Sequence, residues 1–221
     1  MCGITGIARF NQRQLAEERV RVMNRCIAHR GPDAEGLWSN DLCVLGHRRL
    51  SIIDTSAQGN QPFHFDQDRL VVVFNGEIYN YLELKNELAA GFSFQTQTDT
   101  EVIIAAYLKW GTDCVSHFFG MFAFALYDRD SNQLMIARDR LGVKPLYYAQ
   151  TSDGLVFASE IRALLSTGLI EKKIGLNELC DYLRYQTVHA PASIIEGVHM
   201  LMPGHFMLVS VDGFTIQRYW D

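Results

Sequence analysis

The sequence predicts an α+β domain that contains two or more antiparallel sheets. Short apolar runs recur along the chain and are separated by turn signals such as Ser152-Asp153-Gly154. Segments with the helical spacing of apolar residues lie between them. The 221 residues contain no internal repeat, low-complexity tract or linker-like region. We therefore expect one domain rather than several.

The predicted elements of the first half follow from apolar spacing and from the positions of glycine and proline. The predicted strands span residues 4–10, 37–39, 43–47 and 70–74. The predicted helices span residues 15–28, 81–90 and 100–110. Gly31-Pro32 ends the first helix, and the turn dipeptide Asn75-Gly76 ends the last of these strands. The segments 80–83 and 98–101 resemble capping boxes, which open helices.

The second half is rich in strands. The predicted strands span residues 120–127, 133–137, 146–149, 155–159, 205–211 and 214–220. Residues 120–127 alternate large and small side chains, which indicates a central strand. Two further helices are predicted at residues 160–166 and 176–184.

Composition excludes several classes of function. The net charge of −5 comes from interspersed charges, which argues against a nucleic-acid or anionic-membrane partner. We find no signal peptide and no apolar run near the ~20 residues of a membrane span, so we expect a cytoplasmic protein. The seven histidines lack metal-site spacing, so no metal is expected, and no nucleotide-binding motif occurs. Four of the five cysteines are predicted to be buried or semi-buried free thiols: Cys26, Cys43, Cys114 and Cys180.

Cys2 is the candidate nucleophile. Its small side chain permits removal of Met1, which would place a free α-amine on the carbon that carries the thiol. Such an amine has a pKa of about 7.7–8.0 and can serve as a built-in base. The alternative is a small residue ahead of a strand. A dyad of Cys2 with His29 or His47 is also possible, although the amine makes it unnecessary.

Downstream residues match what such a nucleophile needs. Asn75 and Gly76 supply an amide group and a backbone N–H for an oxyanion. Arg49 suits a carboxylate, and Glu77 and Asp99 suit an ammonium group, so together they suit a zwitterionic α-amino acid. Each has a structural alternative: a plain turn for Asn-Gly, a surface position for the arginine, a solvated turn position for the glutamate and a helix cap for the aspartate.

The motifs of this chain resemble the glutaminase domain of glutamine-hydrolysing asparagine synthetases along nearly its whole length. The resemblance rests on Met1-Cys2-Gly3-Ile4, His29-Arg30-Gly31-Pro32-Asp33, His47-Arg48-Arg49-Leu50-Ser51-Ile52-Ile53-Asp54, Asn75-Gly76-Glu77-Ile78-Tyr79-Asn80, Asp99-Thr100-Glu101-Val102, residues 120–125, residues 137–148 and Ala158-Ser159-Glu160-Ile161. Two departures, Thr98 in place of serine and Met202-Pro203-Gly204-His205 in place of Pro-Pro-Gly, leave the proposed chemistry untouched.

The resemblance implies an N-terminal-nucleophile (Ntn) hydrolase, a class II glutamine amidotransferase with a four-layer αββα sandwich. It implies that Cys2 is the nucleophile and that Asn75 and Gly76 form the oxyanion hole. It implies that Glu77 and Asp99 receive the substrate amine. The remaining implied substrate-binding residues are Arg49 for the α-carboxylate and the backbone of Leu50, Ser51, Ile52 and Ile53.

The implied activity is hydrolysis of L-glutamine to glutamate and ammonia through a γ-glutamyl thioester. Residues 1–221 would hold the type-2 amidotransferase domain, about residues 1–210, and the start of a linker to an absent synthetase domain. The implied ATP and Mg²⁺ belong to that domain, which makes asparagine from aspartate, and none is implied in this chain. The chain is either excised or completed by another polypeptide, and a homodimer is one option.

Other functions are also compatible with the sequence. A relative that amidates another acceptor, such as a natural product or a sugar, would have a similar front half. A non-catalytic regulatory or interaction domain of the same fold is a second alternative, although the intact Cys2, Arg49 and Asp99 argue against it. An Ntn peptidase or acylase is a third, but it would not need holders for both a carboxylate and an ammonium group.

Overall fold

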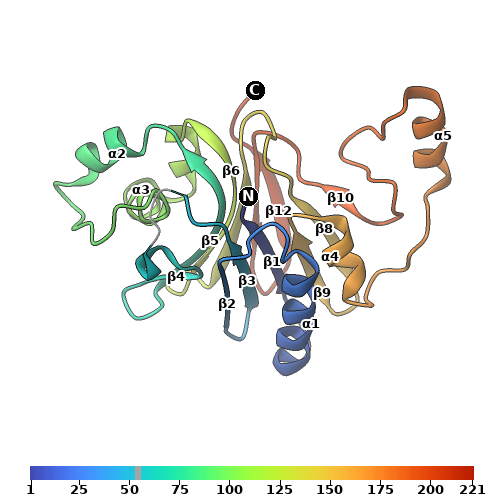
Figure 1. The fold of residues 1–221 in the computed structure, drawn as a ribbon, viewed down its shortest axis with the longest axis horizontal. Helices are drawn as coiled ribbons and strands as arrows, with labels where there is room; N and C mark the ends of the chain where they lie inside the picture. Colours follow the sequence, from blue (N-terminus) through green and yellow to red (C-terminus); the bar gives the residue numbers. More distant parts are fainter. Residues whose placement is uncertain (53–55) are drawn as a thin grey trace.

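The computed structural model describes residues 1–52 and 56–221. Two six-stranded antiparallel sheets lie face to face at the centre of the molecule (Figure 1). The predicted α+β class with antiparallel sheets is therefore confirmed.

The elements are as follows. The strands of the first sheet are β1 (Gly3–Ala8), β2 (Ala34–Ser39), β3 (Cys43–Arg49), β8 (Tyr147–Thr151), β9 (Gly154–Ala158) and β10 (His199–Met200). Those of the second are β4 (Phe63–Phe65), β5 (Leu70–Ile78), β6 (Gly120–Asp128), β7 (Gln133–Arg138), β11 (His205–Val209) and β12 (Phe214–Arg218). The helices are α1 (Arg13–Cys26), α2 (Tyr81–Leu88), α3 (Thr100–Trp110), α4 (Ile161–Ser166) and α5 (Leu176–Tyr185), with 3₁₀ turns η1 (Ala57–Gly59) and η2 (Gly111–His117).

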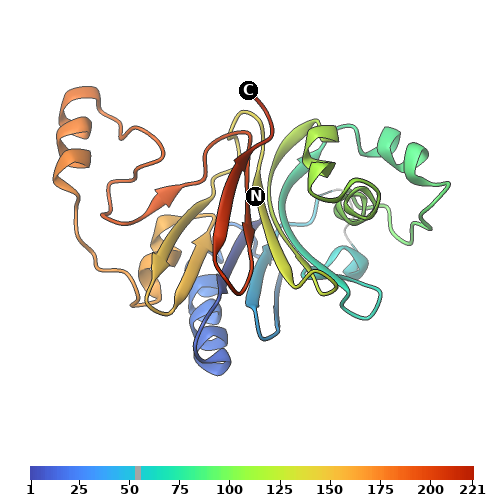
Figure 2. The ribbon, with the colours of Figure 1, turned by 180° about the vertical axis from the view of Figure 1, so that it is seen from behind.

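Helices cover both outer faces of the stacked sheets and complete a four-layer αββα sandwich (Figures 1 and 2). The strand order is β10-β8-β9-β1-β3-β2 in one sheet and β12-β11-β7-β6-β5-β4 in the other. α1 and α4 pack on the first sheet through a core that includes Val20, Met23 and Leu164. α2 and α3 pack on the second through a core that includes Leu84 and Ile103. The expected sandwich is confirmed.

Strand β6 shows why the alternation of large and small residues marks a central strand. Phe122, Phe124 and Leu126 belong to the core under α2 and α3. Ala123 and Ala125 belong to the core between the two sheets. Because successive side chains point to opposite faces of a strand, the bulky groups fill the helix side and methyl groups fill the sheet side.

Strand β5 runs through Asn75 and Gly76, so the predicted turn at this dipeptide is wrong. In the register with β6, Asn75 pairs with Ala123 and Gly76 pairs with Phe122. A Cβ on Gly76 would collide with the carbonyl oxygen of Met121. The glycine is therefore needed for the close approach of two strands, and the strand pairing overrides the turn preference of Asn-Gly.

The two predicted capping boxes have different outcomes. The Asn80 side chain does not cap α2. Its amide donates to the carbonyl oxygen of His117 and accepts from the N–H of Phe119, both at 3.0 Å, so it ties the start of α2 to the segment before β6. At α3, Thr98 Oγ1 accepts from the N–H of Glu101 at 3.4 Å, which is one half of a capping box. The other half is absent, because the Glu101 carboxylate accepts from the N–H groups of Gln95 and Thr96 at 2.8 Å instead of from that of Thr98.

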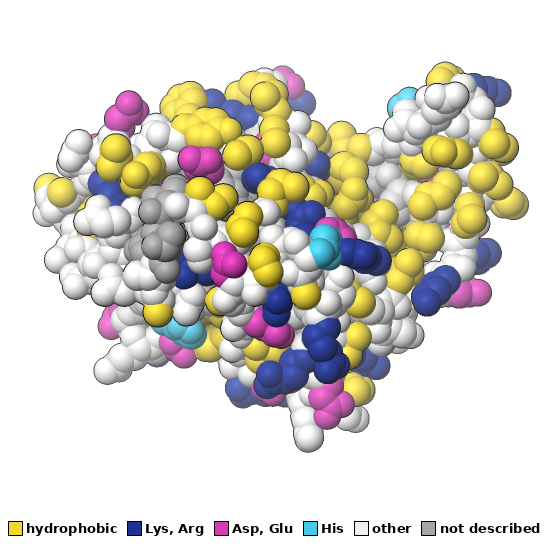
Figure 3. All heavy atoms as spheres, in the orientation of Figure 1, with side chains coloured by type: hydrophobic (Ala, Val, Ile, Leu, Met, Phe, Trp, Pro, Cys, Tyr) yellow, Lys and Arg dark blue, Asp and Glu magenta, His cyan; other side chains and the backbone are white. Residues whose placement is uncertain are grey.

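Helix α5 projects from the sandwich (Figures 1 and 2), and none of its residues is buried. Hydrophobic side chains gather on this lobe (Figure 3), among them Leu176. Cys180 is exposed on α5, which corrects the expectation of a buried thiol, because this helix adds nothing to the described core. Cys43 and Cys114 are buried and Cys26 is half-buried, as predicted.

Two short strands were not predicted from the sequence. Strands β4 and β10 have three and two residues, too few to show a periodicity. In the described ranges, no helix is both long and apolar enough to cross a bilayer.

Candidate active site

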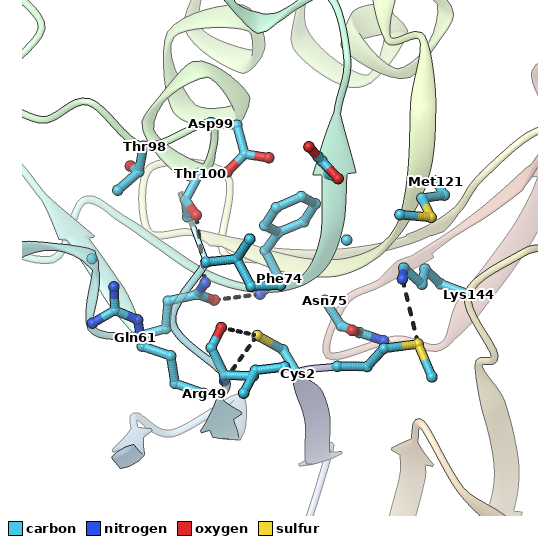
Figure 4. A pocket seen from close by; sticks show the side chains of 16 residues that line it. Cys2, Arg49, Gln61, Phe74, Asn75, Thr98, Asp99, Thr100, Met121 and Lys144 are labelled. Carbon is cyan, nitrogen blue, oxygen red and sulfur yellow. Dashed lines mark hydrogen bonds between the residues drawn. The ribbon is translucent and has the colours of Figure 1, made fainter. Parts of the chain in front are cut away.

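A cavity of about 90 Å³ opens at the N-terminal end of β1 (Figure 4). It is lined by the residue before β1, the end of β3, the last part of β5 and the start of α3. These segments contribute Cys2, Arg49, Asn75 and Asp99, four predicted site residues that are far apart in the sequence. The structure thus brings the predicted nucleophile, oxyanion donor, cation and anion to one place.

The pairing of β1 with β3 positions the thiol of Cys2. Gly3 pairs with Arg48, which puts the backbone of Leu50 beside Cys2. Cys2 Sγ donates to the Leu50 carbonyl oxygen at 3.5 Å and accepts from the Leu50 N–H at 3.4 Å. Arg30 Nε donates to the Cys2 carbonyl oxygen at 2.9 Å.

The side-chain amide of Asn75 faces this cavity. Asn75 is 1% exposed. Its Nδ2 is buried and has no acceptor among the described residues. An unsatisfied buried donor costs about 1–3 kcal/mol, so this N–H₂ group is held ready for an acceptor that a ligand brings.

The backbone N–H of Gly76 points toward the same region. The Phe122 N–H donates to Asp139 Oδ2 at 3.1 Å, and the Phe122 carbonyl oxygen accepts from the Asp139 N–H at 2.8 Å. Both polar groups of Phe122 therefore point away from β5, so Gly76 and Phe122 form a non-hydrogen-bonded pair. The Gly76 N–H points to the opposite edge of β5, where β4 pairs only with residues 70–72. It is a second donor on the edge beside Asn75.

Arg49 lies at the end of β3 and lines the cavity with only 6% of its surface exposed. Its Nη1 donates to the Ser56 carbonyl oxygen at 2.7 Å and to Asn60 Oδ1 at 2.8 Å. A Cβ on Gly59 would collide with Arg49 Nη2. These contacts fix the direction of the guanidinium beside the cavity.

Asp99 occupies the N-cap position of α3, but its side chain does not cap the helix. Its Oδ2 accepts from the N–H of Ile78 at 3.0 Å instead. Burial, with a smaller contribution from Glu77, raises the pKa of Asp99 to about 6, against the opposing effect of the backbone donors. Glu77 is half-buried and lines the same cavity. A ligand ammonium group near this pair would favour its ionised form.

The predicted site residues that follow β3 do not all line the cavity. Leu50 and Ile52 line the cavity. The Ser51 N–H donates to Asp33 Oδ2 at 2.8 Å, and Ser51 lies outside the cavity lining. Ile53 lies outside the described residues.

The two histidines considered as partners of Cys2 are engaged elsewhere. His47 is fully buried, and its Nε2 contacts the Phe74 carbonyl oxygen at 3.0 Å. Burial lowers the pKa of His47 to about 4, so it is neutral at physiological pH. His29 contacts Glu160 at 2.8 Å. In the described ranges, no group of His, Cys, Asp and Glu side chains is arranged to hold a metal ion.

Three residues at or beside the cavity received no role from the sequence: Arg30, Gln61 and Lys144. Gln61 Oε1 accepts from the Phe74 N–H at 2.6 Å and so braces β5. Arg30 and Lys144 lie in motifs that carry the family resemblance, which is the signal that could have singled them out.

The fold and this arrangement define a class of protein, and comparison with known proteins agrees with it. A family model described as a glutamine amidotransferase domain matches residues 1–220. The chain belongs to this family, the class II or N-terminal-nucleophile glutamine amidotransferase domains.

Within the family, the chain is similar to several asparagine synthetases. It is 37% identical to the glutamine-hydrolysing asparagine synthetase 3 of Bacillus subtilis, over all of this chain and 37% of the relative. It is 38% identical to a putative asparagine synthetase 2 of Methanocaldococcus jannaschii, over all of this chain and 46% of the relative. It is 39% identical to the amidase chry2 of Gibberella zeae, over all of this chain and 34% of the relative. The chain thus spans less than half the length of each of these curated relatives.

Solved structures share the fold. The glutamine phosphoribosylpyrophosphate amidotransferase of Bacillus subtilis matches with a TM-score of 0.71 at 20% identity, over 99% of this chain and 49% of that chain. The allosteric regulatory enzyme of purine biosynthesis matches with a TM-score of 0.76 at 21% identity, with the same coverage. At this level of identity, the likeness supports the sandwich and its layers.

Proposed function

We propose that this domain hydrolyses L-glutamine to L-glutamate and ammonia with Cys2 as its nucleophile. The observation that carries the proposal is the cavity in which the Cys2 thiol lies with Asn75 Nδ2, a buried donor that has no acceptor in residues 1–52 and 56–221. A thiol and a preorganised donor are what acyl transfer from an amide requires.

The proposed reaction begins with removal of Met1, which frees the α-amine of Cys2. The amine takes the thiol proton, and the sulfur attacks the side-chain amide carbon of glutamine. As the C–S bond forms, the carbonyl electron pair moves to oxygen, which Asn75 Nδ2 and the Gly76 N–H stabilise. The C–N bond then breaks, and the protonated amine returns its proton to the leaving ammonia. Water hydrolyses the resulting thioester with the amine again as base.

The zwitterionic end of glutamine accounts for the other charged groups. We assign its α-carboxylate to the guanidinium of Arg49, which can form two parallel hydrogen bonds. We assign its α-ammonium to Asp99 and Glu77. The side-chain carbonyl of the substrate then faces Asn75 and Cys2. All five residues line the same cavity.

The fate of the ammonia belongs to a larger protein. We propose that it passes to a synthetase domain that uses ATP and Mg²⁺ to make asparagine from aspartate, and that no cofactor acts in this chain. The names of the asparagine synthetase relatives support this step. The similarity to an amidase supports a second candidate, the transfer of ammonia to another acceptor. Glutamine hydrolysis is common to both candidates.

Replacing Cys2 tests the proposal. With Met1 removed, as checked by intact mass, the native chain should release glutamate from L-glutamine, and Cys2→Ala should release none. The glutamine analogue 6-diazo-5-oxo-L-norleucine should add covalently to the N-terminal peptide of the native chain only. Cys180→Ala is the matched control, because this thiol is exposed on α5, outside the cavity lining. Undiminished glutaminase activity of Cys2→Ala would refute the mechanism.

A second arm of the experiment isolates the amine. Residues fused ahead of Cys2 turn its nitrogen into an amide, which cannot accept the thiol proton. We expect such a chain to fold and yet remain inactive until a protease restores Cys2 as the first residue. Activity before cleavage would exclude the amine as the base.

A further inference from the structure

Lys144 enters the candidate active site from the segment between β7 and β8. It is 5% exposed and lines the same cavity as Cys2. Its Nζ contacts Met1 Sδ at 3.6 Å (Figure 4). Among the described residues, no carboxylate oxygen lies within the 4.0 Å of an ion pair with this ammonium. The residue that Nζ contacts, Met1, is thus the one that the proposed maturation removes.

The turn that carries Lys144 is held rigidly. Asp139 Oδ1 accepts from the N–H groups of Leu141 and Val143, at 3.1 and 2.9 Å. Asp139 Oδ2 accepts from the Lys144 N–H at 2.9 Å. The Arg138 guanidinium donates to the Lys144 carbonyl oxygen at 2.8 Å. Because the backbone is fixed on both sides of Lys144, its side chain is directed into the cavity rather than into solvent.

We propose that Lys144 is a positioning residue that keeps the terminal amine of Cys2 unprotonated and its thiol acidic. Once Met1 is gone, the new α-amine takes the place of the Met1–Cys2 peptide nitrogen, in the cavity that Lys144 lines. A nearby ammonium destabilises a second positive charge and stabilises a negative one. The free amine and the thiolate are the two forms the reaction uses. This inference rests on the proposed glutaminase function.

The surrounding charges are compatible with a cationic Lys144. Burial and the neighbouring Arg30 lower the pKa of Lys144. Cys2, Asp139 and Glu77 act in the opposite direction and favour the ammonium form. Both carboxylate oxygens of Asp139 accept from backbone N–H groups, and Asp139 forms no ion pair with Lys144 Nζ among the described residues. The charge of Lys144 therefore acts on the groups at the chain start.

The test is the pH profile of kcat/KM for L-glutamine in chains that begin at Cys2. Lys144→Met removes the charge and keeps a similar volume. We expect its acid limb to move up by about one pH unit, which lowers kcat/KM about tenfold on that limb and little at high pH. Lys144→Arg keeps the charge and should keep the limb near its native position. An unmoved limb in Lys144→Met, including a uniform fall at all pH values, would overturn the proposal.

A control and an independent measurement complete the design. Arg140→Met removes the same charge from the same turn, but Arg140 Nη2 donates to the Ser116 carbonyl oxygen, outside the cavity, so its profile should match the native one. Alkylation of Cys2 by iodoacetamide against pH, read by mass spectrometry, needs no turnover. Lys144→Met should move this profile to higher pH, and an unmoved profile counts against Lys144. Failure of the native chain to hydrolyse glutamine would instead refute the proposed function and leave the alkylation result standing.

Discussion

At the residue scale, Asp99 shows how a candidate binding group is directed into the cavity instead of capping a helix. Its position at the start of α3 would suit a helix cap, yet Thr98 takes part in the cap and Asp99 turns to the cavity. The carboxylate is buried, and this raises its pKa to about 6. An ionised group in such a place destabilises the empty protein and is available to a cationic ligand.

Replacing Asp99 by Asn should therefore stabilise the protein and weaken glutamine binding. Because the pKa of about 6 in the folded chain lies above the ordinary aspartate pKa of 3.8, the ionised carboxylate destabilises the folded state and the protonated form does not. Above about pH 6 the native chain keeps a buried charge that Asp99→Asn lacks, and the variant should gain about 1–3 kcal/mol in free energy of unfolding. Below about pH 4 the gain should vanish. Urea unfolding at pH 4 and pH 8 measures this difference.

The same titration should appear in substrate binding. As pH falls through about 6, Asp99 takes up a proton and loses its attraction for the substrate ammonium. The KM for glutamine of the native chain should rise in that range. A pH-independent KM would show that Asp99 does not hold the amine.

At the scale of single elements, hydrogen bonds between distant segments override the local sequence preferences at the end of β5 and at the start of α2. Strand β5 passes through a turn dipeptide because β6 pairs with it, and it ends at Ile78. Asn80 follows and bridges to the segment before β6 instead of capping α2. The local sequence favours a turn at Asn75-Gly76 and a helix cap at Asn80. In the structure, Asn75 and Gly76 pair with β6, and Asn80 hydrogen-bonds to residues 117 and 119.

A substitution at Asn80 separates these two roles. Asn80→Ala should lower the free energy of unfolding by about 1–3 kcal/mol, because both of its hydrogen bonds to the chain at 117–119 are lost. Asn80→Ser, a good helix cap, should not restore stability, since serine cannot span the same gap. Asn86→Ala on the exposed face of α2 is the control. Thermal unfolding followed by circular dichroism gives the answer, and full rescue by serine would favour a cap.

At the scale of the whole molecule, the distance between the sheets sets the geometry of the candidate site. Cys2 precedes β1 in one sheet, whereas Asn75 lies on β5 in the other. Ala123 and Ala125 lie in the core between the sheets and allow them to approach closely. The relative position of the Cys2 thiol and the Asn75 amide, the candidate nucleophile and oxyanion donor, therefore depends on small side chains in the layer between the sheets.

Enlarging this layer should damage activity more than stability. Ala125→Leu should cost about 1–3 kcal/mol through overpacking, and it should push the sheets apart and lower kcat for glutamine hydrolysis. Phe124→Leu is the matched control, because Phe124 faces the helix layer and its loss weakens the core without moving the sheets. Equal kcat values in the two variants, at similar losses of stability, would refute this dependence.

The sequence by itself determined the order and type of most elements, because strand and helix periodicities are local properties. It also determined the identities of the candidate nucleophile and of its partners, because their chemistry and motifs are written in single residues such as Cys2 and Arg49. The α3 boundaries, Thr100–Trp110, match the prediction for the same reason.

Only the tertiary structure decided how these groups are used. Three features depend on strand pairing and on buried hydrogen bonds between distant segments. Asn75 Nδ2 has no acceptor in the part of the chain that the structure describes, the Gly76 N–H points away from β6, and Lys144 enters the cavity. Such partners leave no periodic trace in the sequence. Burial also sets the acidity of Asp99 and His47, because desolvation is a property of the packed chain.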